Sequence, residues 1–112
     1  QTLTVYTTEG RLVKEIDCHG IISDEQKGLA ACGEDAVIVS DYQTSSVFRV
    51  NIDSGEVMWT SKYVKKPQGV VCYRNRYVLV TNWNTDTRIW ILDADTGIIT
   101  HCSAKFLSGT GF

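Results

Sequence analysis

Hydrophobic and polar residues alternate along this chain in short runs, and clusters of Gly, Asp, Asn and Ser separate one run from the next. Runs of Val, Ile, Thr, Tyr, Phe and Trp with a period of two predict β-strands. No stretch keeps the 3.6-residue period of an amphipathic helix, and glycine-containing turn signals recur too often for helices. The pattern therefore predicts an all-β chain.

The strand pattern occurs twice in the sequence. Residues 37–42 (VIVSDY) match residues 78–83 (VLVTNW) at an offset of 41, and 47–50 match 89–92 at an offset of 42. Asp53-Ser54-Gly55 and Asp95-Thr96-Gly97 predict equivalent tight hairpins, because Gly takes the positive φ that such turns need. Each copy then predicts four strands, at 28–32, 36–40, 47–52 and 56–59 in the first and 69–73, 77–81, 88–92 and 98–101 in the second.

The N-terminal residues predict half of an earlier copy, with strands at 3–6 and 11–14 that align on Gly55 at an offset of 45. Four short antiparallel strands repeated every ~40 residues are typical of β-propeller blades. A β-sandwich is the alternative, but a sandwich does not need the same turn at the same place in each copy. The predicted organisation is an incomplete blade at 1–16, a blade crossing at 17–27, full blades at 28–68 and 69–110, and the start of another at 111–112.

A propeller ring usually needs about four to eight blades. The chain begins in mid-pattern, as an excised fragment would, and its unpaired blade faces would favour association. We therefore expect either a piece of a larger propeller or a fragment that assembles with copies of itself, and least of all an open arc of blades that stays a monomer.

The copies resemble the NHL repeat, in which a Gly-led strand precedes a Val-rich strand that ends in Asp, then a loop, an apolar strand and a Gly turn. The residues that carry the resemblance are Gly28, Ile38, Val39, Asp41, Val47, Val50 and Gly55 in the first copy and Gly69, Leu79, Val80, Arg88, Ile89 and Gly97 in the second. Residues 77–82 (YVLVTN) are equally similar to the YVTN-type propeller repeat. The NHL resemblance implies a recognition module, such as that of a tripartite-motif E3 ligase, that binds protein or RNA.

The composition favours a soluble domain without a strong electrostatic field. The formal net charge is −2, and no apolar run approaches the length of a membrane span, so we expect no membrane contact. Of the four cysteines, Cys32 and Cys72 lie inside apolar runs, and none of the four has a metal-site spacing. We expect buried, reduced thiols and a cytoplasmic location.

The candidate binding residues lie at one end of the predicted blades, on the loops between second and third strands and on the crossing from one blade to the next. Tyr42 and Trp83 hold equivalent places there, and their rings either anchor a partner or pack over their own blade. Trp59 and Trp90 fall inside strands, where packing between blades is the expectation. The full candidate face is Tyr42, Gln43, Lys62, Tyr63, Lys65, Lys66, Trp83, Asn84 and Arg88.

A protein partner is the leading expectation for this face. RNA is the second, because three lysines surround a tyrosine between Thr60 and Gln68 and could contact phosphate. A metal-dependent lactonase or lyase, an activity of some propellers of similar topology, is the third. That resemblance implies Asp41 and Asn82 as conceivable ligands and His19 and His101 as conceivable acid–base groups. No nucleophile–base spacing or phosphate-binding loop can be identified. We therefore expect no catalytic residue, no metal and no cofactor.

Overall fold

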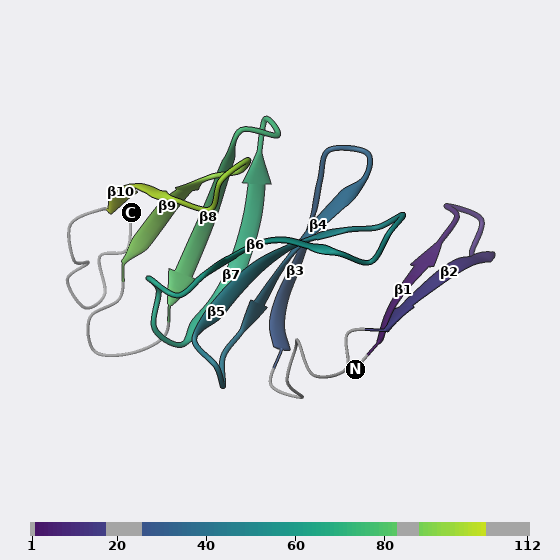
Figure 1. Cartoon of the computed structure of the whole chain (residues 1–112), viewed down its shortest axis with the longest axis horizontal. Coiled ribbons are helices and arrows are strands. Elements are labelled where there is room, and N and C mark those ends of the chain that lie inside the picture. Colours follow the sequence, from purple (N-terminus) through teal and green to yellow (C-terminus); the bar gives the residue numbers. More distant parts are fainter. Residues whose placement is uncertain (1, 18–25, 83–87, 103–112) are drawn as a thin grey trace.

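The computed structural model describes residues 2–17, 26–82 and 88–102, and all of its regular elements are strands. Figure 1 shows β1 and β2 at one end of the long axis and β10 at the other, with the remaining strands between them. The strands are β1 (Thr2–Tyr6), β2 (Leu12–Asp17), β3 (Gln26–Cys32), β4 (Ala36–Asp41), β5 (Ser46–Asn51), β6 (Val57–Ser61), β7 (Pro67–Tyr73), β8 (Tyr77–Asn82), β9 (Ile89–Asp93) and β10 (Ile99–Cys102). The described part of the chain contains no helix long and apolar enough to span a membrane.

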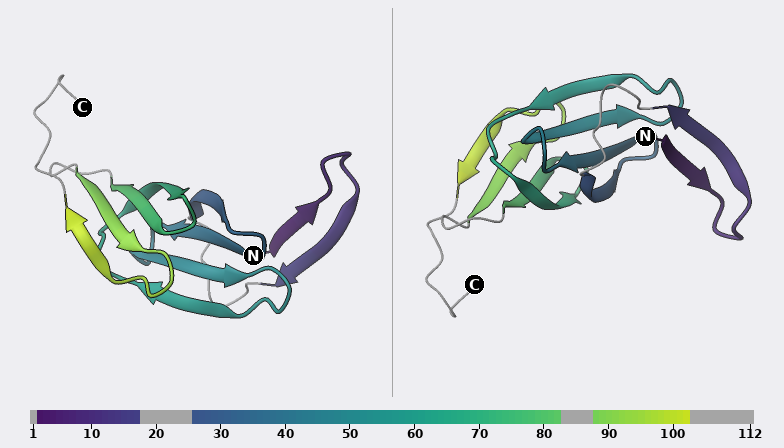
Figure 2. Two further views of the ribbon diagram at one scale, coloured as in Figure 1. Left: turned by 90° about the horizontal axis from the view of Figure 1, so that it is seen from above. Right: turned by 90° about the horizontal axis from the view of Figure 1, so that it is seen from below.

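The strands form three antiparallel sheets in which neighbours in sequence are neighbours in space (Figure 2). The N-terminal hairpin pairs β1 with β2, the first sheet has the order β3-β4-β5-β6, and the second sheet has the order β7-β8-β9-β10. All ten predicted strands are present, with ends shifted by up to three residues, as where β2 continues to Asp17. The all-β prediction and the four-stranded meander of each copy are confirmed.

The hairpins after β5 and β9 are built alike. The side chains of Asn51 and Asp93 each accept hydrogen bonds from two backbone N–H groups in the turn that follows, at 2.8 to 3.0 Å. Gly55 and Gly97 close the turns at φ of 76° and 75°, a conformation that favours glycine. An amide and a carboxylate thus do the same structural work in the two copies.

A β-bulge recurs in each sheet and fixes the register between the copies. The pair Arg49–Trp59 is followed across the bulge by Val50–Val57, and the equivalent pairs are Ile91–His101 and Leu92–Ile99. In the N-terminal hairpin these positions are Val5–Lys14 and Tyr6–Leu12. The bulge makes three sheets of different sequence superimposable in register.

This register corrects the expected N-terminal alignment by one residue. The N–H of Thr7 bonds the carbonyl of Arg11, whereas the N–H of Asn51 bonds that of Glu56, so the first turn is one residue shorter. The offset is therefore 44 before the turn and 45 after it. Because strand side chains alternate between faces, the difference moves Leu3 to the opposite face from that implied by a uniform offset.

The main core lies between the first and second sheets. We call the face of a sheet that points toward the preceding sheet in chain order its back face, and the opposite face its front face. In the N-terminal hairpin, the front face is the one that packs on the first sheet. The front face of the first sheet packs on the back face of the second. The cluster consists of the buried residues Cys32, Ile38, Val47, Trp59, Val64, Val70, Val78, Val80, Leu92 and Ala94.

A smaller core joins the N-terminal hairpin to the back face of the first sheet. Leu3 is buried there against Val39, Phe48 and Val50. The hairpin thus stands toward the first sheet as the first sheet stands toward the second, but with two described strands in place of four.

The first strands of the two sheets, β3 and β7, approach each other closely at Gly28. A Cβ at this position would lie 2.6 Å from the carbonyl oxygen of Gln68, so only glycine fits the gap. Ser40 Oγ donates a 2.7 Å hydrogen bond to the same oxygen. Near the other end of these strands, the N–H of Gly33 donates to Asn75 Oδ1 at 2.9 Å. Backbone-level contacts therefore join the two sheets along their inner strands.

The expectation of reduced cysteines is wrong for two of the four. Cys32 of β3 and Cys72 of β7 form a disulfide between the sheets, with their Cα atoms 5.4 Å apart. Cys72 is equivalent in the repeat to Ala31, one place from Cys32, so the two side chains point to opposite faces of their own sheets and meet at the interface. Cys102 is exposed on β10, and Cys18 lies outside the described residues.

Candidate functional site

The loop between β4 and β5 is held by the buried carboxylate of Asp41. One of its oxygens accepts hydrogen bonds from the N–H groups of Gln43 and Thr44, at 3.1 and 3.3 Å. This arrangement is the turn that Asp commonly forms with its own following backbone. It places Tyr42, which is half-buried, and Gln43, which is exposed, at the end of the first sheet.

The crossing from β6 to β7 is anchored by two buried side chains, Val64 and Pro67. The residues around Val64 therefore point outward, and Tyr63 and Lys65 are exposed. Lys66 adopts a positive φ of 50°, and its N–H donates to Ser45 Oγ at 3.1 Å. The crossing is thus fastened to the loop between β4 and β5.

The lysine side chains of the crossing also reach that loop and the first residue of β5. The ammonium of Lys66 lies 5.7 Å from the centroid of the Tyr42 ring, within range of a cation–π interaction. Lys62 Nζ donates to Ser46 Oγ at 3.1 Å. The Tyr42 ring therefore has a structural role as well, because it helps to hold Lys66 of the crossing against the loop between β4 and β5.

Two open hollows lie on this surface. Tyr42, Gln43, Ser45 and Lys66 line one of about 470 Å³, and Thr60, Ser61, Lys62 and Tyr63 line another of about 420 Å³. We call the surface made by Tyr42, Gln43, Lys62, Tyr63, Lys65 and Lys66 the loop face. It presents phenol rings, an amide and three ammonium groups, a combination that suits an acidic or phosphate-bearing partner.

The remaining candidate residues are not part of the loop face. Arg88 precedes β9 at the place equivalent to Ser46; its N–H donates to Asn82 Oδ1 at 3.1 Å, and its guanidinium lies 3.8 Å from Cys102 Sγ. Trp83 and Asn84 lie outside the described residues.

The expected packing of the tryptophans between sheets is confirmed. The indole N–H of Trp59 donates to the carbonyl oxygen of Ala94 at 2.9 Å, and its ring lies over Gly97, where an added Cβ would collide with it. Trp90 packs against the core between the sheets, and its indole N–H donates to Asn82 Oδ1 at 3.4 Å.

Sequence reasoning missed a buried cation in the same interface. Arg49 donates to the carbonyl oxygen of Ala94 at 2.8 Å, and the same nitrogen lies 3.6 Å from Cys32 Sγ. Its Nε has no hydrogen-bond partner among the described residues. Arg49 stands in an otherwise apolar strand at a front-face position, and this placement is the signal from which its burial between sheets could have been inferred.

The groups considered for catalysis are not brought together. The carboxylate of Asp41 accepts hydrogen bonds from the N–H groups of Gln43 and Thr44. The amide oxygen of Asn82 accepts one from the N–H of Arg88. His101 lies on β10, the last strand of the second sheet. His19 lies outside the described residues. Within the described ranges, no group of three or more His, Cys, Asp or Glu residues is placed to hold a metal ion.

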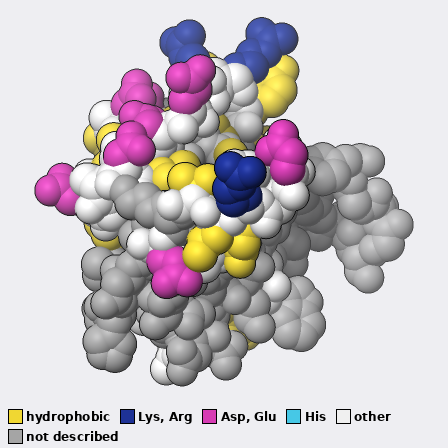
Figure 3. Space-filling model, turned by 90° about the vertical axis from the view of Figure 1, so that its right-hand side faces the viewer, with side chains coloured by type: hydrophobic (Ala, Val, Ile, Leu, Met, Phe, Trp, Pro, Cys, Tyr) yellow, Lys and Arg dark blue, Asp and Glu magenta, His cyan; other side chains and the backbone are white. Residues whose placement is uncertain are grey.

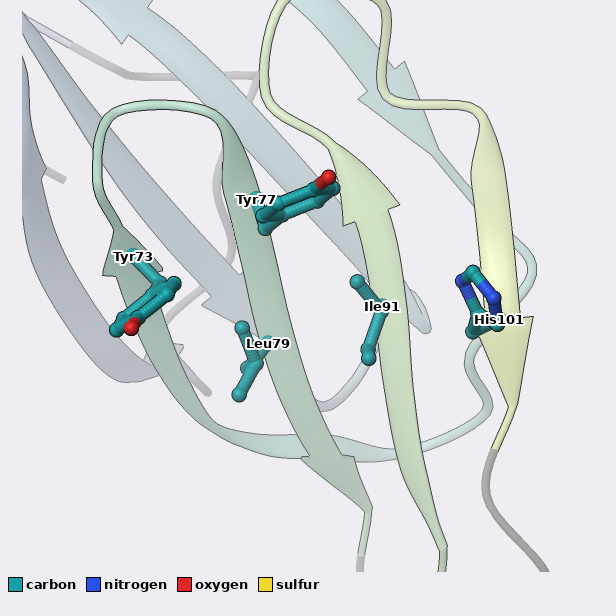
Figure 4. A pocket seen from close by; sticks show the side chains of 5 residues that line it. All are labelled: Tyr73, Tyr77, Leu79, Ile91 and His101. Carbon is teal, nitrogen blue, oxygen red and sulfur yellow. The ribbon is translucent and has the colours of Figure 1, made fainter.

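A third hollow, of about 390 Å³, opens on the front face of the second sheet (Figure 4). Its lining is almost entirely apolar or aromatic, with His101 at its edge on β10. Each lining residue is the repeat equivalent of a front-face residue of the first sheet. In order, Tyr73, Tyr77, Leu79, Ile91 and His101 stand where Cys32, Ala36, Ile38, Arg49 and Trp59 stand in the covered interface.

Comparison with known proteins gives the fold. Eighteen chains among the solved structures match. One is BamB from Moraxella catarrhalis, a β-propeller protein, with a TM-score of 0.70 and 11% sequence identity over 97% of this chain and 31% of that chain. The chain is a partial β-propeller. It spans about a third of the length of this neighbour. No protein-family profile and no curated protein matches the sequence.

The propeller explains the open hollow. The first and second sheets are neighbouring blades, and the front face of the second is where a further blade would pack. Completion by further blades or by partners is what such an open arrangement calls for, because its apolar faces are otherwise exposed to water.

Proposed function

We propose that this chain is a non-catalytic propeller module that recognises a protein partner through the loop face. The observation that carries the proposal is the convergence of two separate loops, which places the Lys66 ammonium over the Tyr42 ring and Lys62 on Ser46. Tyr63, whose side chain is 56% exposed, adds a large rigid ring beside them. Exposed aromatic rings on a fixed scaffold are common anchors of protein recognition, and charged groups around them add specificity.

The partner segment that fits this face is acidic and contains an apolar or aromatic residue. Carboxylates would pair with Lys62 and Lys65, while an apolar side chain would lie against Tyr63. The lysines that contact Ser46 and Tyr42 are partly oriented before binding, which lowers the entropic cost of ordering them. Net affinity would come from the rings and specificity from the charges.

The test is selection from a peptide library displayed on phage. The wild-type chain is expected to enrich acidic peptides with an aromatic residue, and the Tyr63→Ala, Lys66→Glu double variant is expected to lose them. Arg74→Glu reverses a charge on the turn between β7 and β8, at the other end of the sheet, and should bind as the wild type does. Enrichment unaffected by the double variant would refute the loop face as the site.

RNA is the second candidate, and the observation that favours it is the stacking of a lysine on a tyrosine ring within a group of three lysines. Each phosphate neutralised by a lysine contributes a slope of about −0.7 in log affinity against log salt for single strands. Binding of a labelled single-stranded RNA should therefore weaken steeply with salt and on Lys65→Glu with Lys66→Glu. A peptide-binding module without RNA affinity shows neither effect.

The repeat type and the cellular setting form the finer part of the proposal. The Gly28, Asp41 and Gly55 positions support an NHL-type blade and, by that resemblance, a substrate-recognition or scaffold role in a tripartite-motif protein; the YVTN-type repeat is the alternative at 77–82. The disulfide between Cys32 and Cys72 removes the cysteines as a reason for a cytoplasmic location. That location stays a prediction, to be tested by fractionation of cells that express the protein.

A further inference from the structure

The interface between the first and second sheets shows how blades of this chain pack on one another. On the front face of the first sheet, Ile38 and Trp59 are buried against the back face of the second sheet. On that back face, Leu92 is fully buried at the position that follows the bulge pair. This interface is the template for any further contact of the same kind.

The front face of the second sheet repeats the template but lacks its cover. Leu79 occupies the place of Ile38, and the pair Ile91–His101 occupies the place of Arg49–Trp59. Ile91 replaces the buried cation, so a body that covers this face need not supply an acceptor for a guanidinium. Val71 and Tyr73 extend the apolar surface and are at least half exposed.

The complementary back face is found at the other end of the molecule. Tyr6 and Leu12 form the pair equivalent to Val50–Val57 and Leu92–Ile99. Val50 and Leu92 are buried by the preceding sheet, whereas Tyr6 and Leu12 are 58% and 51% exposed. Figure 3 looks at the molecule from this end and shows hydrophobic side chains gathered near the middle of the face, among basic and acidic ones.

We propose that the front face of the second sheet binds the back face of the N-terminal hairpin of a second copy of this chain. The contact is continuous with an established interface, since it repeats in register the one that already joins the first and second sheets. His101 stands where Trp59 donates to the carbonyl of Ala94, and an imidazole N–H can donate to the equivalent turn carbonyl of the second copy, at Thr8. The formal net charge of −2 opposes association only weakly.

The proposed contact is head-to-tail, because the two surfaces are different and lie at opposite ends of the chain. Such heterologous contacts build a ring when the rotation closes and a filament when it does not. A blade-to-blade rotation favours a ring, as in propellers of one chain. The contact does not involve the loop face, so the inference stands or falls independently of the proposed function.

The experiment is light scattering on the purified chain and on two variants, each altered at one end. Leu79→Asp with Ile91→Asp places charge on the front face, and Tyr6→Asp with Leu12→Asp places charge on the back face. The wild type should have a mass above that of one chain, and each variant alone should be a monomer. An equimolar mixture of the two should give a dimer, since it retains one intact pair of faces and no more.

The controls separate this contact from general stickiness and from misfolding. Tyr63→Asp removes an equally exposed ring from the loop face and should assemble as the wild type does. Circular dichroism checks that the variants keep their strands, and the milder pair Leu79→Ser with Ile91→Thr replaces the front-face variant if it unfolds. A monomeric wild type, a mass insensitive to either variant, or a mixture without dimer would overturn the proposal.

Discussion

The first and second sheets have equivalent strands, bulges and turns, yet the front face of the first is buried and that of the second is open. In the first sheet the front-face residue Ile38 is fully buried, while its equivalent Leu79 lines an open hollow in the second. The local sequence does not decide this difference, since both residues stand at the centre of an apolar strand. Burial in a repeat architecture comes from the neighbouring repeat, because each unit has two faces to cover and no second layer of its own.

Trp59 and His101 should show the largest contrast between the two sheets. Trp59→Ala removes a ring packed between the sheets and one of two donors to the carbonyl of Ala94, and should lower the free energy of unfolding by about 3–5 kcal/mol. His101→Ala at the exposed equivalent position, measured at a protein concentration low enough for a monomer, should change it by less than about 0.5 kcal/mol. Urea unfolding followed by fluorescence of the remaining tryptophans measures both. Equal losses would mean that the two sheets do not pack as described.

Ile38 and Leu79 sharpen the comparison with side chains of equal size. Ile38→Ala leaves a cavity between the sheets and should cost about 2–4 kcal/mol. Leu79→Ala, measured at a protein concentration low enough for a monomer, should cost less than about 1 kcal/mol, because water already reaches the side chain. At high concentration the Leu79 variant should lose more, since the proposed second copy would cover this position. Stability independent of concentration in the wild type would contradict that last expectation.

Gly28 and Gly69 are equivalent positions on the covered front face of the first sheet and the open front face of the second. A Cβ at position 28 would meet the Gln68 carbonyl at 2.6 Å. One at position 69 meets the Thr81 hydroxyl at 3.1 Å, so this exposed side chain, which accepts a hydrogen bond from the Gly69 N–H, needs only a small shift. Gly28→Ala should therefore cost about 1–3 kcal/mol and Gly69→Ala within about 0.5 kcal/mol of zero. Thermal unfolding at matched concentration distinguishes them. A tolerated Gly28→Ala would show that the inner strands are further apart.

The smallest expected effect concerns the two hairpin turns. The N–H groups of Asp95 and Thr96 hold the pKa of Asp93 below its ordinary value of 3.8, whereas Asn51 does the same work without titrating. Because the folded pKa lies below the unfolded one, this stabilisation is complete above the ordinary pKa and is lost as the pH falls through the lowered one. Asp93→Asn should flatten the acid limb of the stability profile slightly. An unchanged limb would argue against the carboxylate contacts.

The fold was largely predictable from sequence, because alternation and turn chemistry are local. The Asp53-Ser54-Gly55 turn and the strand on either side of it follow from residues close together in the chain, and the inter-sheet role of Trp59 was expected from its place within a repeated strand. The N-terminal offset was not predictable to the residue, since the turn at Gly10 is one residue shorter and only the backbone hydrogen bonds of Thr7 reveal it.

The candidate site was predictable in part. The mapping of loops to one end of the blades brought Tyr42 and Lys66 together correctly, but it could not show that the lysine would lie on the ring. The Cys32–Cys72 bridge and the burial of Arg49 depend on which face of one sheet meets which face of the next. Such contacts join residues about 40 positions apart, and no local pattern encodes them.

The most direct measurement for the blade-on-blade arrangement is mass spectrometry of the chain after mild oxidation and non-reducing proteolysis. The structure places β3 and β7 side by side, so the peptide that contains Cys32 should be recovered covalently joined to the peptide that contains Cys72, and reduction should separate them. A chain that retains its strands but joins Cys32 only to Cys18 or Cys102 would contradict the packing of the two sheets as neighbouring propeller blades.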